Sequence, residues 1–75
     1  MIRYAVIRCA WDGEAGVWFV QDTDIPGLVT EAPTLDALRG KLPGMVRDLL
    51  DDEADVEIEL DLIAHSHDRI VVNAA

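Results

Sequence analysis

The chain is poor in the features that mark secreted or membrane-bound proteins. It contains one cysteine in 75 residues, Cys9, so no internal disulfide can form and a reducing compartment, the cytoplasm, is predicted. The N-terminal segment does not match a signal peptide, because Arg3 and Arg8 interrupt its apolar residues. Nor does any apolar run approach the roughly 20 residues that a membrane-spanning helix requires. We therefore expect a soluble cytoplasmic protein that does not bind a membrane.

Lysine and arginine are also scarce. Six of them stand against fifteen aspartates and glutamates, and the net charge is −9. A field of this sign repels phosphate backbones, so direct binding to nucleic acid is not expected. It would instead attract a basic protein and accelerate the encounter with it. The alternative, that the acidic surface serves only solubility, stays open at this point.

The length allows one small domain. Apolar residues make up 51% of the chain, which is enough for a core. A domain of this size nevertheless buries only about 60% of the surface of its unfolded chain, so self-association would add to its stability, and we expect a homo-oligomer, a dimer through edge strands. We expect a single domain over residues 1–75, with a core at about residues 2–64. Residues 68–75 would form a tail or, through residues 69–72, a short fifth strand.

The first half of the chain has the pattern of a β-meander. Residues 2–11 carry β-branched and aromatic side chains on both faces, which is typical of a central strand. Residues 12–16 contain two glycines and suit a hairpin loop that leads to a second strand at residues 17–21. The pair Pro26-Gly27 suits a type II turn, after which residues 28–32 form a short third strand.

Leucines at helical spacing predict a helix from residue 35 to about residue 50. Thr34 precedes it and is a good N-cap. The pair Pro43-Gly44 lies inside this segment, where a proline costs roughly 3 kcal/mol in a regular helix. We therefore expect a kink, or two shorter helices, with both parts covering the same sheet.

The last strand is predicted at residues 56–62, where polar and apolar residues alternate strictly. Val56, Ile58, Leu60 and Leu62 would share one face, and Glu57, Glu59 and Asp61 the other. Joined together, the elements give a β-β-β-α-β, α+β fold: a three-stranded antiparallel meander, one helix on one face, and a fourth strand. A right-handed crossover would place the fourth strand parallel to the first, with strand order 3-2-1-4.

One combination of residues resembles a known family. The turn Asp24-Ile25-Pro26-Gly27, the segment Leu28-Val29-Thr30 and the helix start Thr34-Leu35 are similar to the HicB-like antitoxin fold, which is a partial ribonuclease H-like fold. The similarity covers about residues 2–64 and points to a group of short, stand-alone HicB-like domains of unknown function. The fold-marking positions are Asp24, Pro26, Gly27 and Thr34.

The resemblance implies a protein-binding function. Members of the HicB family neutralise a small basic toxin that cleaves messenger RNA, and many carry a C-terminal DNA-binding segment. Only about ten residues follow the fourth strand here, too few for such a segment, so autorepression is not expected. The alternative is an orphan structural or oligomerisation module that has no toxin and dimerises through edge strands.

Acidic residues are the best candidates for partner binding. Adjacent like charges on one strand face repel each other, so such a row costs some stability unless a partner neutralises it. The competing interpretation is a solvated face whose charges discourage edge-to-edge aggregation. The candidate residues are Asp51, Asp52, Glu57, Glu59 and Asp61.

No catalytic residue, metal site or cofactor is predicted. A two-metal nuclease of the ribonuclease H type would need a carboxylate on the first strand, and that strand has none. His65 and His67 have a spacing that a metal could use, but zinc generally requires three or four ligands, so two surface histidines are expected. Cys9 is expected to be a buried structural thiol. Of the two tryptophans beside the first turn, Trp11 and Trp18, at least one should belong to the core.

Overall fold

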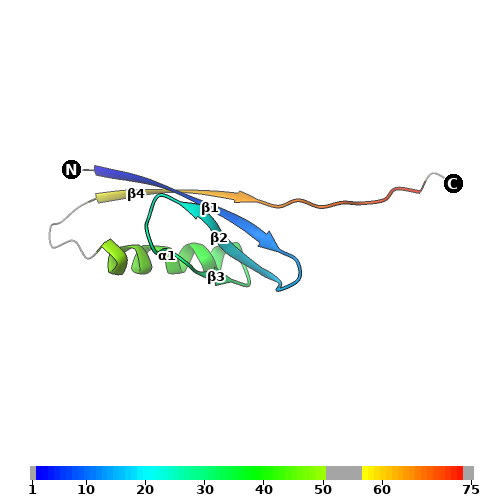
Figure 1. Cartoon of the computed structure of the whole chain (residues 1–75), viewed down its shortest axis with the longest axis horizontal. Coiled ribbons are helices and arrows are strands. Elements are labelled where there is room, and N and C mark those ends of the chain that lie inside the picture. Colours follow the sequence, from blue (N-terminus) through cyan, green and yellow to red (C-terminus); the bar gives the residue numbers. More distant parts are fainter. Residues whose placement is uncertain (1, 51–56, 74–75) are drawn as a thin grey trace.

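A mixed four-stranded sheet is covered on one face by one helix in the computed structural model, which describes residues 2–50 and 57–73 (Figure 1). The elements are β1 (Ile2–Asp12), β2 (Val17–Thr23), β3 (Glu31–Ala32), α1 (Leu35–Leu50) and β4 (Glu57–His65). The strand order is β3-β2-β1-β4, with β4 parallel to β1 and the other pairs antiparallel. The predicted fold class, element order and sheet topology are confirmed.

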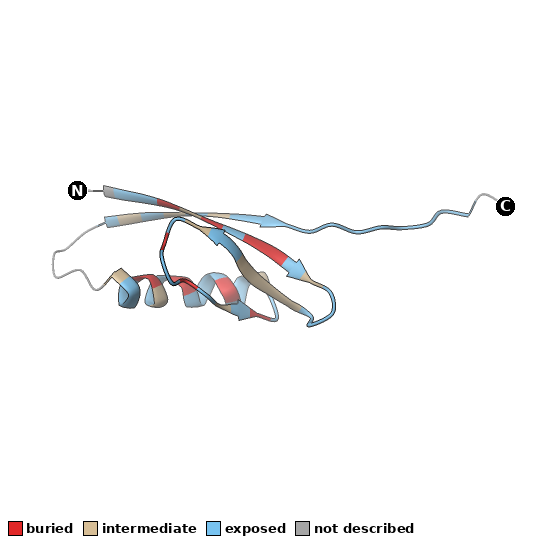
Figure 2. Ribbon diagram, in the orientation of Figure 1, coloured by how far each residue is buried: buried red, intermediate tan, exposed pale blue. Residues whose placement is uncertain are grey.

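The core lies between β1 and α1. Ile7 and Cys9 of β1 are almost completely buried, as expected for a central strand, and Ile7 belongs to the core cluster with 0% of its surface exposed. On α1, Leu38, Leu42 and Val46 are buried at intervals of four residues, so they form one stripe along the helix. Figure 2 shows this buried stripe on the helix and the buried segment of β1.

The tryptophans lie at the hairpin end of the sheet. Trp11 and Trp18 are directly opposite each other on β1 and β2, with ring centroids 5.6 Å apart and planes inclined at 56°. Trp18 is half-buried and packs against the core, whereas Trp11 is 38% exposed. The expectation that at least one tryptophan contributes to the core is met by Trp18.

The turn that carries the family resemblance has a structural role. Gly27 adopts φ +80° and the Leu28 amide donates to the Ile25 carbonyl oxygen at 3.3 Å, as a type II turn requires. Asp24 joins this turn to the central strand, because its Oδ2 accepts a hydrogen bond from the Val6 amide at 3.0 Å. The turn is thereby fixed against β1.

The third strand is shorter than predicted. Only Glu31 and Ala32 pair with β2, although the alternation suggested a strand over residues 28–32. The Leu28 amide donates its hydrogen bond within the turn, and the Leu28 side chain is buried in the core with 4% of its surface exposed. Leu28 therefore cannot also pair with β2. The Thr30 carbonyl oxygen still accepts one hydrogen bond from the Val20 amide, at 3.1 Å.

The division of the helix at Pro43 is not observed. α1 runs without interruption from Leu35 to Leu50 with Pro43 inside it. Proline has no amide hydrogen, so the backbone carbonyl four residues before Pro43 loses its helical hydrogen bond. Because Pro43 lies on the exposed side of α1, water can solvate this carbonyl. The buried stripe is unaffected, and this side of the helix tolerates the proline.

The C-terminal tail is not a fifth strand. Residues 66–73 are extended and exposed, and they pair with none of the four strands that the structure describes. The reason lies in β1, whose pairing with β4 ends at Ala10 and His65 just before the chain turns into the hairpin. After His65, β1 no longer runs beside the chain, so the tail has no neighbouring strand with which to form hydrogen bonds.

Replacing Thr34 with alanine is expected to lower the free energy of unfolding by about 1 kcal/mol. The Thr34 hydroxyl oxygen accepts a hydrogen bond from the Ala37 amide at 3.0 Å, which confirms the predicted N-cap. Thr34→Ser keeps this acceptor and serves as the matched control. Equal urea midpoints for the alanine and serine variants would contradict the capping role.

Candidate functional site

Three carboxylates lie in a row on β4, and we call Glu57, Glu59 and Asp61 the acidic ladder. All three are exposed, while Ile58 and Leu60 between them are half-buried against the core. The ladder therefore lies on the sheet face that α1 does not cover. This arrangement is the one predicted from the alternation. The other two candidate residues, Asp51 and Asp52, lie outside the described residues.

Tyr4, which was not among the predicted site residues, belongs to the same surface. In the parallel pairing of β1 with β4, Tyr4 lies beside Glu59 and Val6 beside Asp61. The Tyr4 hydroxyl donates a hydrogen bond to Oδ2 of Asp61 at 2.7 Å, although 61% of the residue is exposed. Its position in the alternation of β1 was the available signal, but only the strand register identifies its partner.

The ladder changes the acidity of this tyrosine. The hydrogen bond to Asp61 raises the pKa of Tyr4 above its ordinary value of about 10, and desolvation and the negative charges of Asp61, Glu59 and Asp24 act in the same direction. The neutral hydroxyl donates to the carboxylate, whereas a tyrosinate would lose that bond and face like charge. The stabilising contribution is therefore present below the ordinary tyrosine pKa and is lost as the pH rises through the elevated one.

Replacing Asp61 with alanine is expected to lower the pKa of Tyr4 towards its ordinary value. Tyr4 is the one tyrosine of the chain, so tyrosinate absorbance in an alkaline titration reports it directly. Asp48→Ala removes the same charge from the exposed side of α1 and is the matched control. A pKa of Tyr4 that shifts equally in both variants would show that general charge, not the hydrogen bond, is responsible.

The face around the ladder is mixed in character. Further along the two strands, Arg8 of β1 lies between Ile63 of β4 and Asp22 of β2. Ile63 is 39% exposed, so apolar surface is available next to the carboxylates and the guanidinium. This face therefore combines carboxylates, an aromatic hydroxyl, a guanidinium and exposed aliphatic surface.

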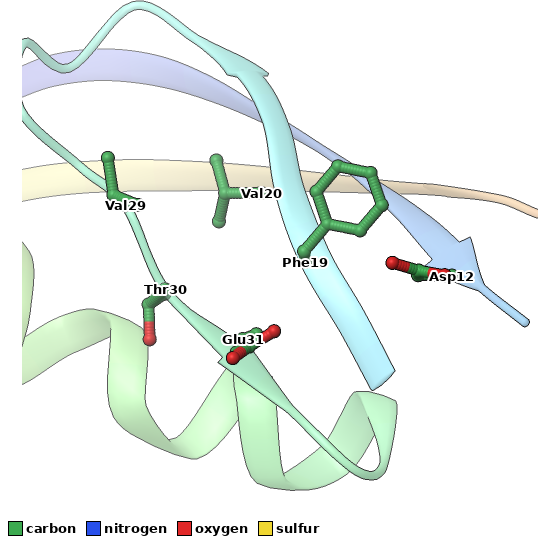
Figure 3. Close-up of a pocket in the computed structure, with 6 residues that line it drawn as sticks. All are labelled: Asp12, Phe19, Val20, Val29, Thr30 and Glu31. Carbon is green, nitrogen blue, oxygen red and sulfur yellow. The ribbon is translucent and has the colours of Figure 1, made fainter. Parts of the chain in front are cut away.

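A shallow hollow lies at the opposite edge of the sheet, beside β2 and the segment that leads into β3 (Figure 3). Its volume is about 480 Å³, and it is lined by Asp12, Phe19, Val20, Val29, Thr30 and Glu31. Asp12 is already engaged, because its Oδ1 accepts hydrogen bonds from the amides of Glu14 and Ala15. The hollow can accommodate an apolar side chain of a partner, and Val29 at its rim is 82% exposed.

The remaining candidates for chemistry are Cys9, His65 and His67. Cys9 is buried, as predicted for a structural thiol, and desolvation raises its pKa. His65 ends β4 and His67 lies in the tail, both exposed. Among residues 2–50 and 57–73, no three histidine, cysteine, aspartate or glutamate side chains are grouped so that they could hold a metal ion. Within the same ranges, no helix is long and apolar enough to cross a membrane.

Comparisons with known proteins give a family but no activity. The crystal structure of the hypothetical protein TTHA1013 from the extremely thermophilic bacterium Thermus thermophilus is similar to this chain, with 39% sequence identity and a TM-score of 0.66. The similarity covers 93% of this chain and 100% of that one. No curated protein matches. Residues 4–74 match the family described as a domain of unknown function, DUF1902. The chain therefore belongs to the DUF1902 family.

Proposed function

We propose that this protein is a non-enzymatic protein-binding domain that acts as an antitoxin, neutralising a small basic toxin that cleaves RNA. The observation that carries the proposal is the acidic ladder: Glu57, Glu59 and Asp61 are exposed side by side on the sheet face that α1 leaves uncovered. The resemblance to HicB-like antitoxins supplies the class of partner, and membership in DUF1902 leaves that function open.

The electrostatic argument favours a basic partner. The chain has a net charge of −9, so its field accelerates association with cationic proteins. The ladder concentrates part of this charge where it can form charge-assisted hydrogen bonds with lysine and arginine side chains. Tyr4 and Ile63 would add contact area beside these bonds. Such a surface could cover the cationic site with which a ribonuclease binds its substrate.

Co-expression tests the antitoxin function. The chain is expressed together with the product of a short basic open reading frame adjacent to its gene, with the neighbour expressed alone as the control. We expect the neighbour to arrest growth by itself, and the chain to restore growth and to co-purify with the neighbour. A neighbour that is not toxic, or that fails to co-purify, would refute the antitoxin function.

The alternative is an orphan structural module that has no toxin. The two edges of the described sheet favour it, because β3 and β4 each pair with one neighbour and could each accept a further strand. In this case the co-expression experiment gives neither arrest nor rescue. The module would act by assembling with other copies of itself.

A further inference from the structure

The C-terminal tail presents apolar side chains that the domain does not use. Residues 66–73 continue β4 in an extended line away from the other elements (Figure 1), and the molecule measures 63 Å along its longest axis against 21 and 19 Å across. Ile70, Val71 and Val72 are each exposed by 79–80%. Three consecutive β-branched residues favour an extended strand, and within the described part of the chain they have neither a pairing partner nor a core to cover.

The outer edge of β4 has no pairing partner in the described sheet either, and it could pair with an extended segment such as the tail. In the described sheet β4 pairs with β1 on one side, so along its nine residues the other side presents unpaired backbone donors and acceptors. The apolar residues of β4 that pack against the core, Ile58, Leu60 and Leu62, are only half-buried. The sheet thus ends in an incompletely covered apolar strip beside a free backbone edge.

We propose that two copies of this chain associate by exchanging their tails, so that each tail pairs antiparallel with the free edge of β4 in the other copy. β4 and the tail form one extended strand. If a two-fold axis passes between the His65 residues of two such strands, each residue before His65 in one copy lies opposite the residue equally far after His65 in the other copy, so that the numbers of paired residues sum to 130. Ile70 then lies opposite Leu60 of the second copy, and Val72 opposite Ile58. Residues opposite each other in an antiparallel pair share a face, so the tail extends the half-buried apolar strip.

The charges agree with this register. Arg69 lies opposite Asp61 of the second copy, Val71 lies opposite Glu59, and no acid faces another acid. If the pairing of the tail with β4 were shifted by one residue, Ile70 would lie opposite Asp61. Each side chain of the tail would then lie on the other face of the sheet. Direct pairing of two β4 strands centred on Asp61 would bring two copies of this carboxylate together, which is unfavourable. The tail is therefore the better partner for this edge.

The exchange leaves the face of the acidic ladder open to solvent, although Arg69 and Val71 of the second copy come to lie beside Asp61 and Glu59 on that face. The tail pairs at the edge, in the plane of the sheet, whereas the ladder points out of that plane on the face opposite α1. The inference is independent of the proposed function, because it requires no toxin. It identifies a second copy of the chain as a partner and gives the tail a function.

Sedimentation velocity of the full chain across micromolar concentrations tests the proposal, and a dimer is expected. Ile70→Lys is expected to raise the dimer dissociation constant about tenfold or more, because a charge replaces an apolar contact at two symmetric positions. Val71→Lys is the matched control: the residue is equally exposed, but it lies opposite Glu59, so the dimer is expected to be retained or tightened. Both substitutions lie in the exposed tail, so folding of the domain is not at risk.

A disulfide experiment checks the register. A chain carrying both Asp61→Cys and Arg69→Cys is expected to form intermolecular disulfides under oxidation, and either single variant is not expected to form that heterologous pair; Cys9 is buried and does not compete. A monomeric chain, equal effects of the two lysine variants, or absence of the 61–69 disulfide would each overturn the tail exchange. None of these outcomes affects the co-expression test, so the two proposals can fail separately.

Discussion

Replacing Leu42 with alanine is expected to lower the free energy of unfolding by about 2–5 kcal/mol. Leu42 is 1% exposed at the centre of the helix stripe, between Leu38 and Val46, so truncation leaves a cavity in the core cluster in addition to removing buried apolar surface. Small domains have total stabilities of only about 5–15 kcal/mol, and a loss of this size is a large fraction of the total. Urea denaturation of the variant at a fixed protein concentration measures the effect.

Leu49→Ala provides the matched control for the core substitution. Leu49 has the same side chain on the same helix, but 42% of it is exposed. We expect a loss of less than about 1 kcal/mol, because less apolar surface is withdrawn from water. Similar losses for both variants would contradict the placement of the core between the Leu42 stripe and β1.

Neutralising the acidic ladder is expected to weaken binding to the proposed basic toxin by up to about 100-fold. The variant carries Glu57→Gln, Glu59→Gln and Asp61→Asn, and each exposed ion pair that is lost contributes about 0.2–1 kcal/mol. The association rate should fall and its dependence on salt should weaken, because the charges also steer the encounter. Titration calorimetry and association kinetics at two salt concentrations measure these effects.

A second triple variant separates the ladder from the general charge. Glu14→Gln, Asp36→Asn and Asp48→Asn change the net charge from −9 to −6, as the ladder variant does, but these residues lie on the hairpin loop and on the outer side of α1. We expect this control to slow association slightly and to leave the dissociation rate unchanged. If both triple variants lose the same affinity, the proposed toxin does not bind at the ladder and only the overall charge of the chain matters.

Several parts of the fold were predictable because they depend on local patterns. The strict alternation from Glu57 to Leu62 fixed the face of each side chain in β4, and the confirmed alternation needed no knowledge of the neighbours. Gly27 with φ +80° and the Thr34 cap were likewise predictable from short-range backbone chemistry. The double-sided apolar pattern of β1 indicated its central place in the sheet.

The predictions that the structure revises concern segments where tertiary contacts outweigh the local pattern. The segment from Leu28 to Ala32 looked like a strand, but burial of Leu28 below the turn leaves only its last two residues to pair. Pro43 suggested a kink or two shorter helices; α1 is not divided, and the place of Pro43 on its exposed side leaves the buried stripe intact. For residues 69–72 the sequence left a tail and a short fifth strand open, and strand propensity alone could not show that β1 enters the hairpin before it could pair with them.

The sequence by itself determined the α+β class, the order of the elements and the presence of an exposed row of acids, because periodicity and turn chemistry act within a few residues. Only the tertiary structure decided that Tyr4 donates to Asp61, since this contact joins residues 57 positions apart and depends on the register of two parallel strands. It also decided that the apolar tail extends beyond the end of β4, apart from the described sheet, and that the outer edge of β4 is unpaired within that sheet. Both results depend on which strands lie next to each other in the sheet, and the burial of apolar side chains in the common core determines that arrangement.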